Sequence, residues 1–128
     1  GGWNAPPQDL ATWIGFLSAA TGGDRGRAAR FETVLRHATL TEMWRPIVPV
    51  GVEDGESAGL GFFLLKQGGV TLVGHTGEQA GYRSFFYFNP ATRAGVIGVV
   101  TTTNEARPRD SGTAFRAALL SAVRLIRP

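Results

Sequence analysis

Four short apolar runs separated by glycine-containing turns occupy the second half of this 128-residue chain. They cover residues 60–66, 70–75, 82–88 and 96–103, and each has the length of a β-strand. Gln67-Gly68-Gly69, between the first two runs, is a hairpin signal. Strands that follow one another through such short turns pair antiparallel. The pattern therefore predicts one antiparallel sheet of about four strands.

The residues before this sheet have helical periodicity. Apolar side chains at positions 10, 13, 14 and 17 share one face of a helix that Pro6-Pro7 can begin and Gly22-Gly23 ends. A second helix is expected over residues 24–37, with His37 as a C-terminal cap. A short helical turn is expected over 41–44. The inward residues of the second helix are expected to be Ala28, Phe31, Val34 and Leu35.

A long last helix is expected from a Ser111 cap to about Arg127, with Arg116 pointing away from the core. The predicted fold is of the α+β type, an antiparallel sheet with preceding helices and a C-terminal helix packed on it. Residues 1–57 are expected to be mainly helix and loop, and residues 58–128 to hold the sheet and last helix. The buried stripe of that helix comprises Phe115, Ala118, Leu119, Ala122, Val123 and Ile126.

The composition limits the function classes that need to be considered. A hydrophobic content of 43% and a charged content of 18% are those of a globular chain. Because there is no cysteine, disulfides and thiolate metal sites are excluded, and periplasmic, secreted and cytosolic locations all stay open. No apolar run approaches the length of a membrane helix, and no signal peptide is expected at the start.

The net charge of +3 suggests a nucleic-acid partner, but the charge pattern does not support one. The arginines are spread along the chain with acidic neighbours, whereas nucleic-acid binding needs a basic face. Glu53, Asp54 and Glu56 lie among glycines with loose spacing, so a solvated loop is expected there and not a cation site. No metal, nucleotide or flavin site is expected, and so no cofactor.

Chemistry is expected in the stretch Gly74-His75-Thr76-Gly77-Glu78-Gln79-Ala80-Gly81-Tyr82. It joins two apolar runs, with His75 expected near the end of the first strand. Its three glycines indicate positive φ or close approach of another group. A His-x-Gly at a strand end offers a ring nitrogen and backbone N–H groups to one site. The alternative interpretation is a hairpin with a partly buried histidine.

Four motifs follow one another in a characteristic order: Pro7-Gln8-Asp9-Leu10-Ala11, Gly59-Leu60-Gly61-Phe62, Gly74-His75-Thr76-Gly77 with Gly81-Tyr82, and Gly98-Val99-Val100-Thr101 with Asn104. Their order resembles the C-terminal part of the penicillin-recognising serine hydrolases. This family includes class C-type β-lactamases, D-alanyl-D-alanine carboxypeptidases and the family VIII-type esterases of the same fold. The resemblance implies a β-lactamase/transpeptidase-like fold and favours a periplasmic or secreted location.

His75-Thr76-Gly77 matches the family's third motif, K-T-G or H-x-G, on a strand that borders the active site. The resemblance implies that His75 is catalytic and that the backbone N–H of Glu78 is an oxyanion donor. Such donors contribute about 3–4 kcal/mol. It further implies that Thr76, Gly77 and Tyr82 bind substrate, with Gly77 leaving room along the strand.

The family's nucleophile motif, S-x-x-K, is absent from these 128 residues. Tyr87-Phe88-Asn89 spells the family's Y-x-N, but it follows the His-Thr-Gly instead of preceding it, and we interpret it as a strand end and turn. The serine and its lysine are therefore expected on an N-terminal part, in cis or as a separate chain. The alternative is a non-catalytic binding or assembly domain that retains the hydrolase sheet.

Two further expectations follow from the resemblance. The substrate is a small molecule or peptide, and a β-lactam, a D-amino-acid peptide and an ester all stay open. A sheet taken from a two-part fold should expose apolar surface that the other part covers, and such surface favours self-association.

Overall fold

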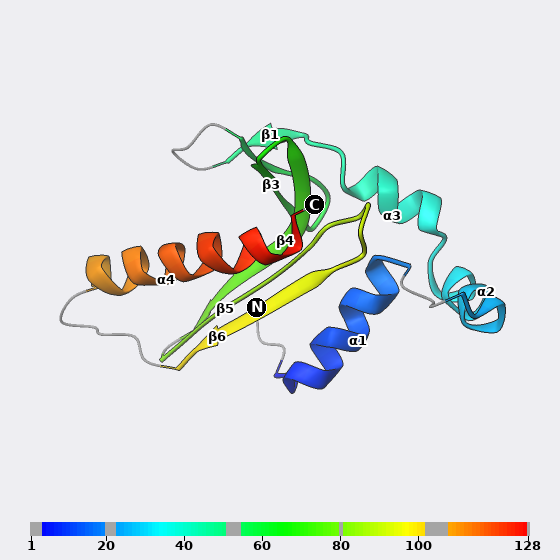
Figure 1. The fold of residues 1–128 in the computed structure, drawn as a ribbon, viewed down its shortest axis with the longest axis horizontal. Helices are drawn as coiled ribbons and strands as arrows, with labels where there is room; N and C mark the ends of the chain where they lie inside the picture. Colours follow the sequence, from blue (N-terminus) through cyan, green and yellow to red (C-terminus); the bar gives the residue numbers. More distant parts are fainter. Residues whose placement is uncertain (1–3, 20–22, 51–54, 80, 102–107, 128) are drawn as a thin grey trace.

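The computed structural model describes residues 4–19, 23–50, 55–79, 81–101 and 108–127, with backbone alone for 108–111. Six strands form one antiparallel sheet in sequence order, and helices lie against it (Figure 1). The helical elements are α1 (Pro7–Leu17), α2 (Arg25–Val34), α3 (His37–Met43), α4 (Pro108–Val123) and the short 3-10 helix η1 (Arg124–Ile126). The strands are β1 (Val48–Pro49), β2 (Glu56–Ala58), β3 (Phe63–Gln67), β4 (Val70–Gln79), β5 (Tyr82–Phe88) and β6 (Gly95–Val100).

The antiparallel sheet and the last helix confirm the predicted fold class, with two more strands than expected. β1 and β2 were not predicted, because both are short and border the acidic, glycine-containing stretch interpreted as a loop. Residues 51–54, which include Glu53 and Asp54, lie outside the described residues, as do residues 102–103 at the expected end of the last strand.

β3 and β4 differ in extent from the predicted strands. β3 begins at Phe63, because Gly61 has a φ of +74° and turns the chain after the exposed Leu60. β4 does not stop at His75 but continues through the whole His-Thr-Gly to Gln79. It does so because every residue from Val73 to Gln79 has a partner on β5.

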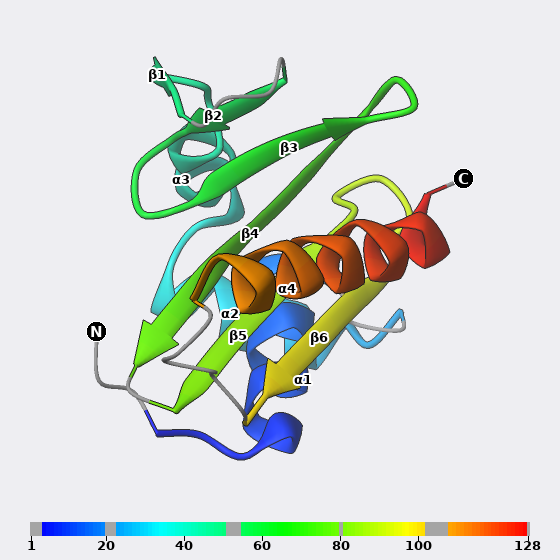
Figure 2. The same cartoon turned by 90° about the vertical axis from the view of Figure 1, so that its left-hand side faces the viewer.

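The sheet lies between two helical layers and has a core on each face. α4 packs on one face, and α1 lies on the other (Figures 1 and 2). Alternation along β4 sends Leu72 to the α4 side and Val73 to the α1 side. The core on the α1 side contains Ile14, Leu17, Leu40, Phe62, Leu64, Val73 and Phe88. The core on the α4 side contains Leu65, Leu72, Phe85, Tyr87, Leu119, Val123 and Ile126.

α4 starts earlier than predicted and its arginines are not all directed outward. It begins at Pro108, so Ser111 lies inside the helix and not at its N-cap. Proline is favoured in the first helical turn because it has no N–H to leave unpaired. The Arg116 guanidinium forms an ion pair with Glu56 of β2, so this side chain ties α4 to the sheet.

The predicted second helix ends early, at Val34, and the turn expected over 41–44 falls at the end of a longer helix, α3. Leu35 has extended backbone angles, φ −157° and ψ 129°, and separates α2 from α3. His37 is consequently the first residue of α3 and not a C-terminal cap. α2 has no buried residue, and Val34, expected to point inward, is 73% exposed. Asp24 caps α2 by accepting the Arg27 N–H at 3.0 Å, which lowers the pKa of its carboxyl.

Tyr87-Phe88-Asn89 is a strand end followed by a turn, as predicted. Asn89 is fully buried, and its Oδ1 accepts the N–H of Ala91 at 2.9 Å. Its Nδ2 donates to the carbonyl of Ile126 at 3.0 Å, which ties the β5–β6 turn to η1. Asn89 is thus structural, since both ends of its side chain have partners inside the fold.

Candidate active site

The feature that defines the candidate site is a difference in strand length. β3 pairs with β4 only as far as Phe63 opposite Gly74, whereas β5 pairs with β4 up to Gln79. Figure 2 shows β4 running on past the start of β3. Within the described residues, positions 75–79 therefore have a neighbour on one side only. An unpaired strand edge is a ready template for an extended substrate.

The register shows which backbone groups face this free edge. Gln79 and Tyr82 close a two-residue hairpin, so 79, 77 and 75 are hydrogen-bonded positions toward β5. Gln67 and Val70 close the β3–β4 hairpin. Hydrogen-bonded positions counted along β4 from this hairpin show the same alternation. The backbone groups of Thr76 and Glu78 therefore point away from β5, toward the free edge. The N–H of Glu78, which the family resemblance implies is an oxyanion donor, is one of the groups that face this edge.

The imidazole of His75 lies at this edge. Its Nδ1 is 2.5 Å from the carbonyl oxygen of Thr76, so Nδ1 carries the proton in this contact. The ring stacks on Phe63, with centroids 4.5 Å apart and an interplanar angle of 17°. The side chain is exposed, and its Nε2 has no partner among the described residues. The alternative interpretation is therefore wrong about burial, whereas the stretch does form a hairpin between β4 and β5.

Gly77 has no side chain to cover the strand edge beside His75. It lies opposite Ser84, whose Oγ would be 3.0 Å from a Cβ at this position. A side chain there would stand next to the imidazole. No unusual backbone angle calls for glycine at position 77, because among the described glycines of this hairpin Gly81 alone has a positive φ, +82°.

Tyr87 of β5 packs against Gly74, the residue of β4 that precedes His75. Tyr87 is opposite Gly74, and a Cβ on Gly74 would be 2.6 Å from its ring, so the aromatic side chain covers the glycine. Burial, assisted by the Glu56 carboxylate and opposed by the Arg116 guanidinium, raises the pKa of Tyr87 to about 12. This tyrosine is thus a neutral core residue, and its role is to hold β4 and β5 in register.

The side chain of Glu78 points to the α4 side and is paired. Its Oε1 accepts from Arg83 Nε at 3.1 Å and from Nη2 at 2.8 Å, and the two residues are direct cross-strand partners. Arg83 was not among the predicted site residues. Its pairing with Glu78 could have been predicted from the sequence. A turn at 80–81 places the opposite charges at 78 and 83 directly across the hairpin from each other.

The structure brings four of the five predicted residues into one contiguous edge, His75 through Glu78. Thr76 contributes a backbone carbonyl, and its side chain is half-buried opposite Phe85. Tyr82 is separate. It is 56% exposed at the hairpin end, four residues from the position opposite His75. At the rise of a β-strand this is about 13 Å along the strand.

No serine is activated within the described part of the chain. Ser18 donates to the Ile14 carbonyl at 2.8 Å and is buried in the core. Ser84 faces Gly77 from the neighbouring strand. Among the serines with described side chains, none is hydrogen-bonded to a lysine or histidine. The geometry thus contains a strand edge and a histidine but no nucleophile paired with a base.

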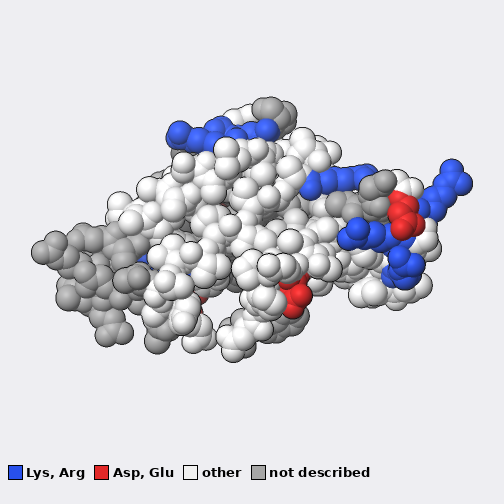
Figure 3. Space-filling view, turned by 60° about the horizontal axis from the view of Figure 1, so that its bottom comes forward, with Lys and Arg blue, Asp and Glu red and all other residues white. Residues whose placement is uncertain are grey.

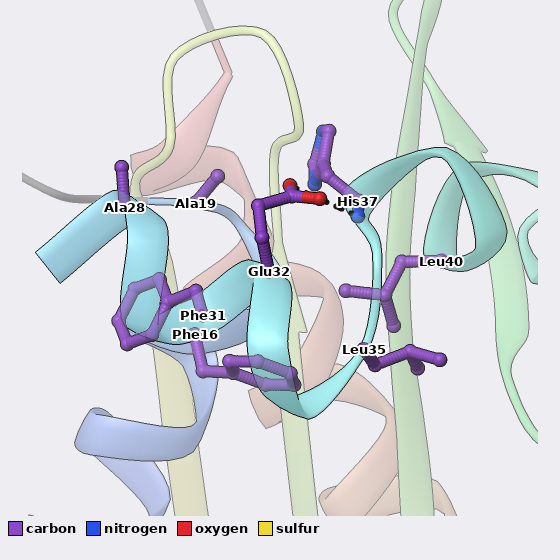
Figure 4. A pocket seen from close by; sticks show the side chains of 8 residues that line it. All are labelled: Phe16, Ala19, Ala28, Phe31, Glu32, Leu35, His37 and Leu40. Atoms are coloured by element: carbon purple, nitrogen blue, oxygen red, sulfur yellow. Dashed lines mark hydrogen bonds between the residues drawn. The ribbon is translucent and has the colours of Figure 1, made fainter. Parts of the chain in front are cut away.

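A second candidate is a cavity between α1, α2 and α3, shown in Figure 4. It has a volume of about 50 Å³ and is lined mainly by apolar side chains such as Phe16, Phe31 and Leu40. Glu32 accepts the backbone N–H of His37 at 3.2 Å at its rim. Small-molecule pockets usually measure about 300–1,000 Å³. This cavity is therefore a packing gap between helices and not a substrate site.

The described ranges hold no group of three or more His, Cys, Asp or Glu side chains able to bind a metal ion. No helix in the same ranges is long and apolar enough to cross a bilayer.

An antiparallel sheet between helical layers, with His-Thr-Gly on a strand whose edge is free, is the arrangement expected for the active-site side of a penicillin-recognising serine hydrolase. The family model described as Beta-lactamase matches residues 1–121. The chain therefore belongs to the beta-lactamase family, and the resemblance of its sequence is confirmed. No curated protein matches the chain.

Proposed function

We propose that this chain supplies the H-x-G strand side of the active site of a serine hydrolase. The observation that carries the proposal is the free edge of β4, where the Glu78 N–H and the His75 imidazole lie within four residues of each other. The reaction is acyl transfer on an ester or amide. A serine oxygen attacks the carbonyl carbon, the leaving alcohol or amine departs with a proton, and water then hydrolyses the acyl-enzyme.

Each residue of the edge has a defined role in this proposal. The N–H of Glu78 donates to the oxygen of the tetrahedral intermediate, where negative charge develops. His75 accepts a hydrogen bond or relays a proton through Nε2, because Nδ1 is engaged by the Thr76 carbonyl. Thr76 offers backbone groups to a substrate lying along the strand, Gly77 leaves space for it, and Tyr82 contacts its far end.

The serine and its lysine are supplied from outside these 128 residues, by a segment with S-x-x-K and Y-x-N in cis or on a separate chain. The family resemblance also favours a periplasmic or secreted location for the assembled enzyme. The substrate is a β-lactam, a D-amino-acid peptide or an ester.

A second candidate function is a non-catalytic binding or assembly module. The observation in its favour is the absence of any S-x-x-K in the chain. In this case the free edge of β4 binds an extended peptide, and no bond is broken.

Turnover distinguishes the two functions. The chain alone is expected to leave nitrocefin and p-nitrophenyl esters at the background rate of hydrolysis. Joined to a segment carrying S-x-x-K and Y-x-N, it is expected to hydrolyse at least one of them, and His75→Ala is expected to lower that rate. A properly folded assembly without activity on any of these substrates favours the binding module.

A further inference from the structure

The proposed oxyanion donor and a carboxylate belong to the same residue. The N–H of Glu78 has to stabilise a developing negative charge, while its side chain carries a negative charge a few bonds away. Like charges at such distances repel, most strongly where water is excluded. We propose that Arg83 is a positioning residue that neutralises the Glu78 carboxylate and anchors this end of the hairpin to α4. This inference rests on the proposed function of the Glu78 N–H.

Arg83 and Glu78 form an ion pair across the hairpin. Two nitrogens of Arg83 donate to the same oxygen of Glu78, at 3.1 Å from Nε and 2.8 Å from Nη2. The Arg83 side chain is 13% exposed, whereas that of Glu78 is 65% exposed. The cation is thus held inside the fold and the carboxylate reaches in to meet it. A cation that is already in place needs no movement when the substrate binds.

Arg83 also contacts α4. Its guanidinium carbon lies over the ring of Phe115 at 6.0 Å, and Phe115 packs edge-on against Phe85 with centroids 5.7 Å apart. One turn earlier on α4 stands Gly112, where a Cβ would come within 3.2 Å of Arg83 Nη1. The Phe115 ring and the space left by the missing side chain of Gly112 therefore accommodate the Arg83 guanidinium on α4.

This end of β4 has little strand pairing to hold it. Residues 75–79 lack a β3 neighbour, so in the described part of the chain β5 is the one strand that pairs with them. Strand ends with one neighbour open locally at low free-energy cost. An oxyanion donor must stay fixed to be effective. Arg83 links Glu78 through its guanidinium to the buried side of α4, which restrains the pair that closes the hairpin.

The test uses three variants and one control. Arg83→Gln removes the cation, Arg83→Lys keeps a cation without the planar fork, and Arg83→Gln combined with Glu78→Gln removes both charges. Arg124→Gln is the control, because Arg124 is exposed on η1 and away from the hairpin. Ester hydrolysis is measured in the chain joined to a segment carrying S-x-x-K and Y-x-N.

Arg83→Gln is expected to lower kcat about tenfold with KM changed less than about twofold, because the unpaired carboxylate acts on the transition state. The kcat of Arg83→Lys is expected to lie between that of Arg83→Gln and that of the original protein. The double variant is expected to recover at least half of kcat, and Arg124→Gln to leave it unchanged. An unchanged kcat in Arg83→Gln, or no recovery in the double variant, overturns the neutralising role.

A second measurement needs no activity. Amide hydrogen exchange of the 128-residue chain reports on Gly77 and Gln79, whose N–H groups face β5 in the register. Arg83→Gln is expected to speed their exchange about three- to tenfold, because the hairpin end opens more often. Equal exchange rates overturn the anchoring role. If the joined protein hydrolyses nothing, the proposed function and the neutralising role are both overturned. The anchoring role of Arg83 is then tested by amide hydrogen exchange alone.

Discussion

The Nδ1 atom of His75 donates its proton to the carbonyl oxygen of Thr76, the next residue along β4, over 2.5 Å. Because a carbonyl can only accept, this contact selects the tautomer of the neutral ring and leaves the Nε2 lone pair free. Stacking on Phe63 holds the ring in place. A histidine oriented in this way can accept a hydrogen bond from a substrate or from a neighbouring nucleophile.

The tautomer of His75 is measurable by ¹⁵N NMR at mildly alkaline pH. The expected spectrum has a protonated Nδ1 and an unprotonated Nε2 for His75. Phe63→Ala removes the stacking partner and is expected to make the two nitrogens more nearly equivalent, because the ring then samples other orientations. Signals of a protonated Nε2 in the original protein would contradict the arrangement. His75→Asn assigns the signals, since His37 is the other histidine of the chain.

Two glycines of β4 are expected to respond differently to alanine. At Gly74 the added methyl group meets the Phe86 carbonyl and lies 2.6 Å from the Tyr87 ring, so Gly74→Ala is expected to cost about 1–3 kcal/mol of unfolding free energy. At Gly77 the nearest atom is Ser84 Oγ at 3.0 Å, which a small side-chain shift relieves. Gly77→Ala is therefore expected to change stability little, yet to lower turnover in the assembled enzyme. Urea unfolding and ester hydrolysis measure the two effects, and a reversed order of stabilities would be inconsistent with the register.

Alkaline pH is expected to destabilise the protein through Tyr87. Its pKa is about 12 in the folded chain against an ordinary 10.0, so the folded state keeps a proton that the unfolded chain loses between these values. The stability linked to this proton is fully present below pH 10 and is lost as pH rises toward 12. The free energy of unfolding falls by about 3 kcal/mol over this range. Tyr87→Phe is expected to abolish this part of the pH dependence. Tyr82→Phe, at the exposed tyrosine, is the control and is expected to retain it.

Self-association is expected because the described surface exposes apolar side chains. β6 is the last strand of the sheet, and its Val99 is 50% exposed. In Figure 3 the basic residues gather mainly toward one end of the face shown, and its middle carries few charges. Light scattering is expected to find dimers or larger species of the chain alone. Val99→Lys is expected to reduce them, since a charge on an edge strand opposes pairing, whereas Val34→Lys on α2 is expected not to. A monodisperse monomer at high concentration would argue for a self-sufficient domain.

The sheet and the last helix were predictable because their signals are local. The glycine pair at 68–69 and the apolar runs of strand length indicate which strands pair, and the stripe of α4 is long enough to stand out. The break at Leu35 was not predictable from periodicity. Residues 24–37 contain no proline or glycine near the break, and the apolar pattern continues through it. The division into α2 and α3 is fixed by tertiary packing, which sequence propensity does not register.

The candidate site was predictable in its residues and not in its geometry. The order of motifs points to His75 and the Glu78 N–H, but the free edge exists only because β3 ends at Phe63 while β4 continues. That difference in length depends on the turn at Gly61. Arg83 was missed because its role depends on the register of the hairpin and on α4, which lies about thirty residues further along the chain.

The central claim is that this chain provides a strand edge but no nucleophile, and covalent labelling tests it most directly. Intact-mass spectrometry after incubation with a fluorophosphonate is expected to find no adduct on the chain alone. After addition of a segment carrying S-x-x-K and Y-x-N, one adduct per assembly is expected, on the serine of that segment, and His75→Ala is expected to slow its formation. A one-to-one adduct on the isolated chain, mapped to Ser18, Ser57, Ser84, Ser111 or Ser121, would contradict the account.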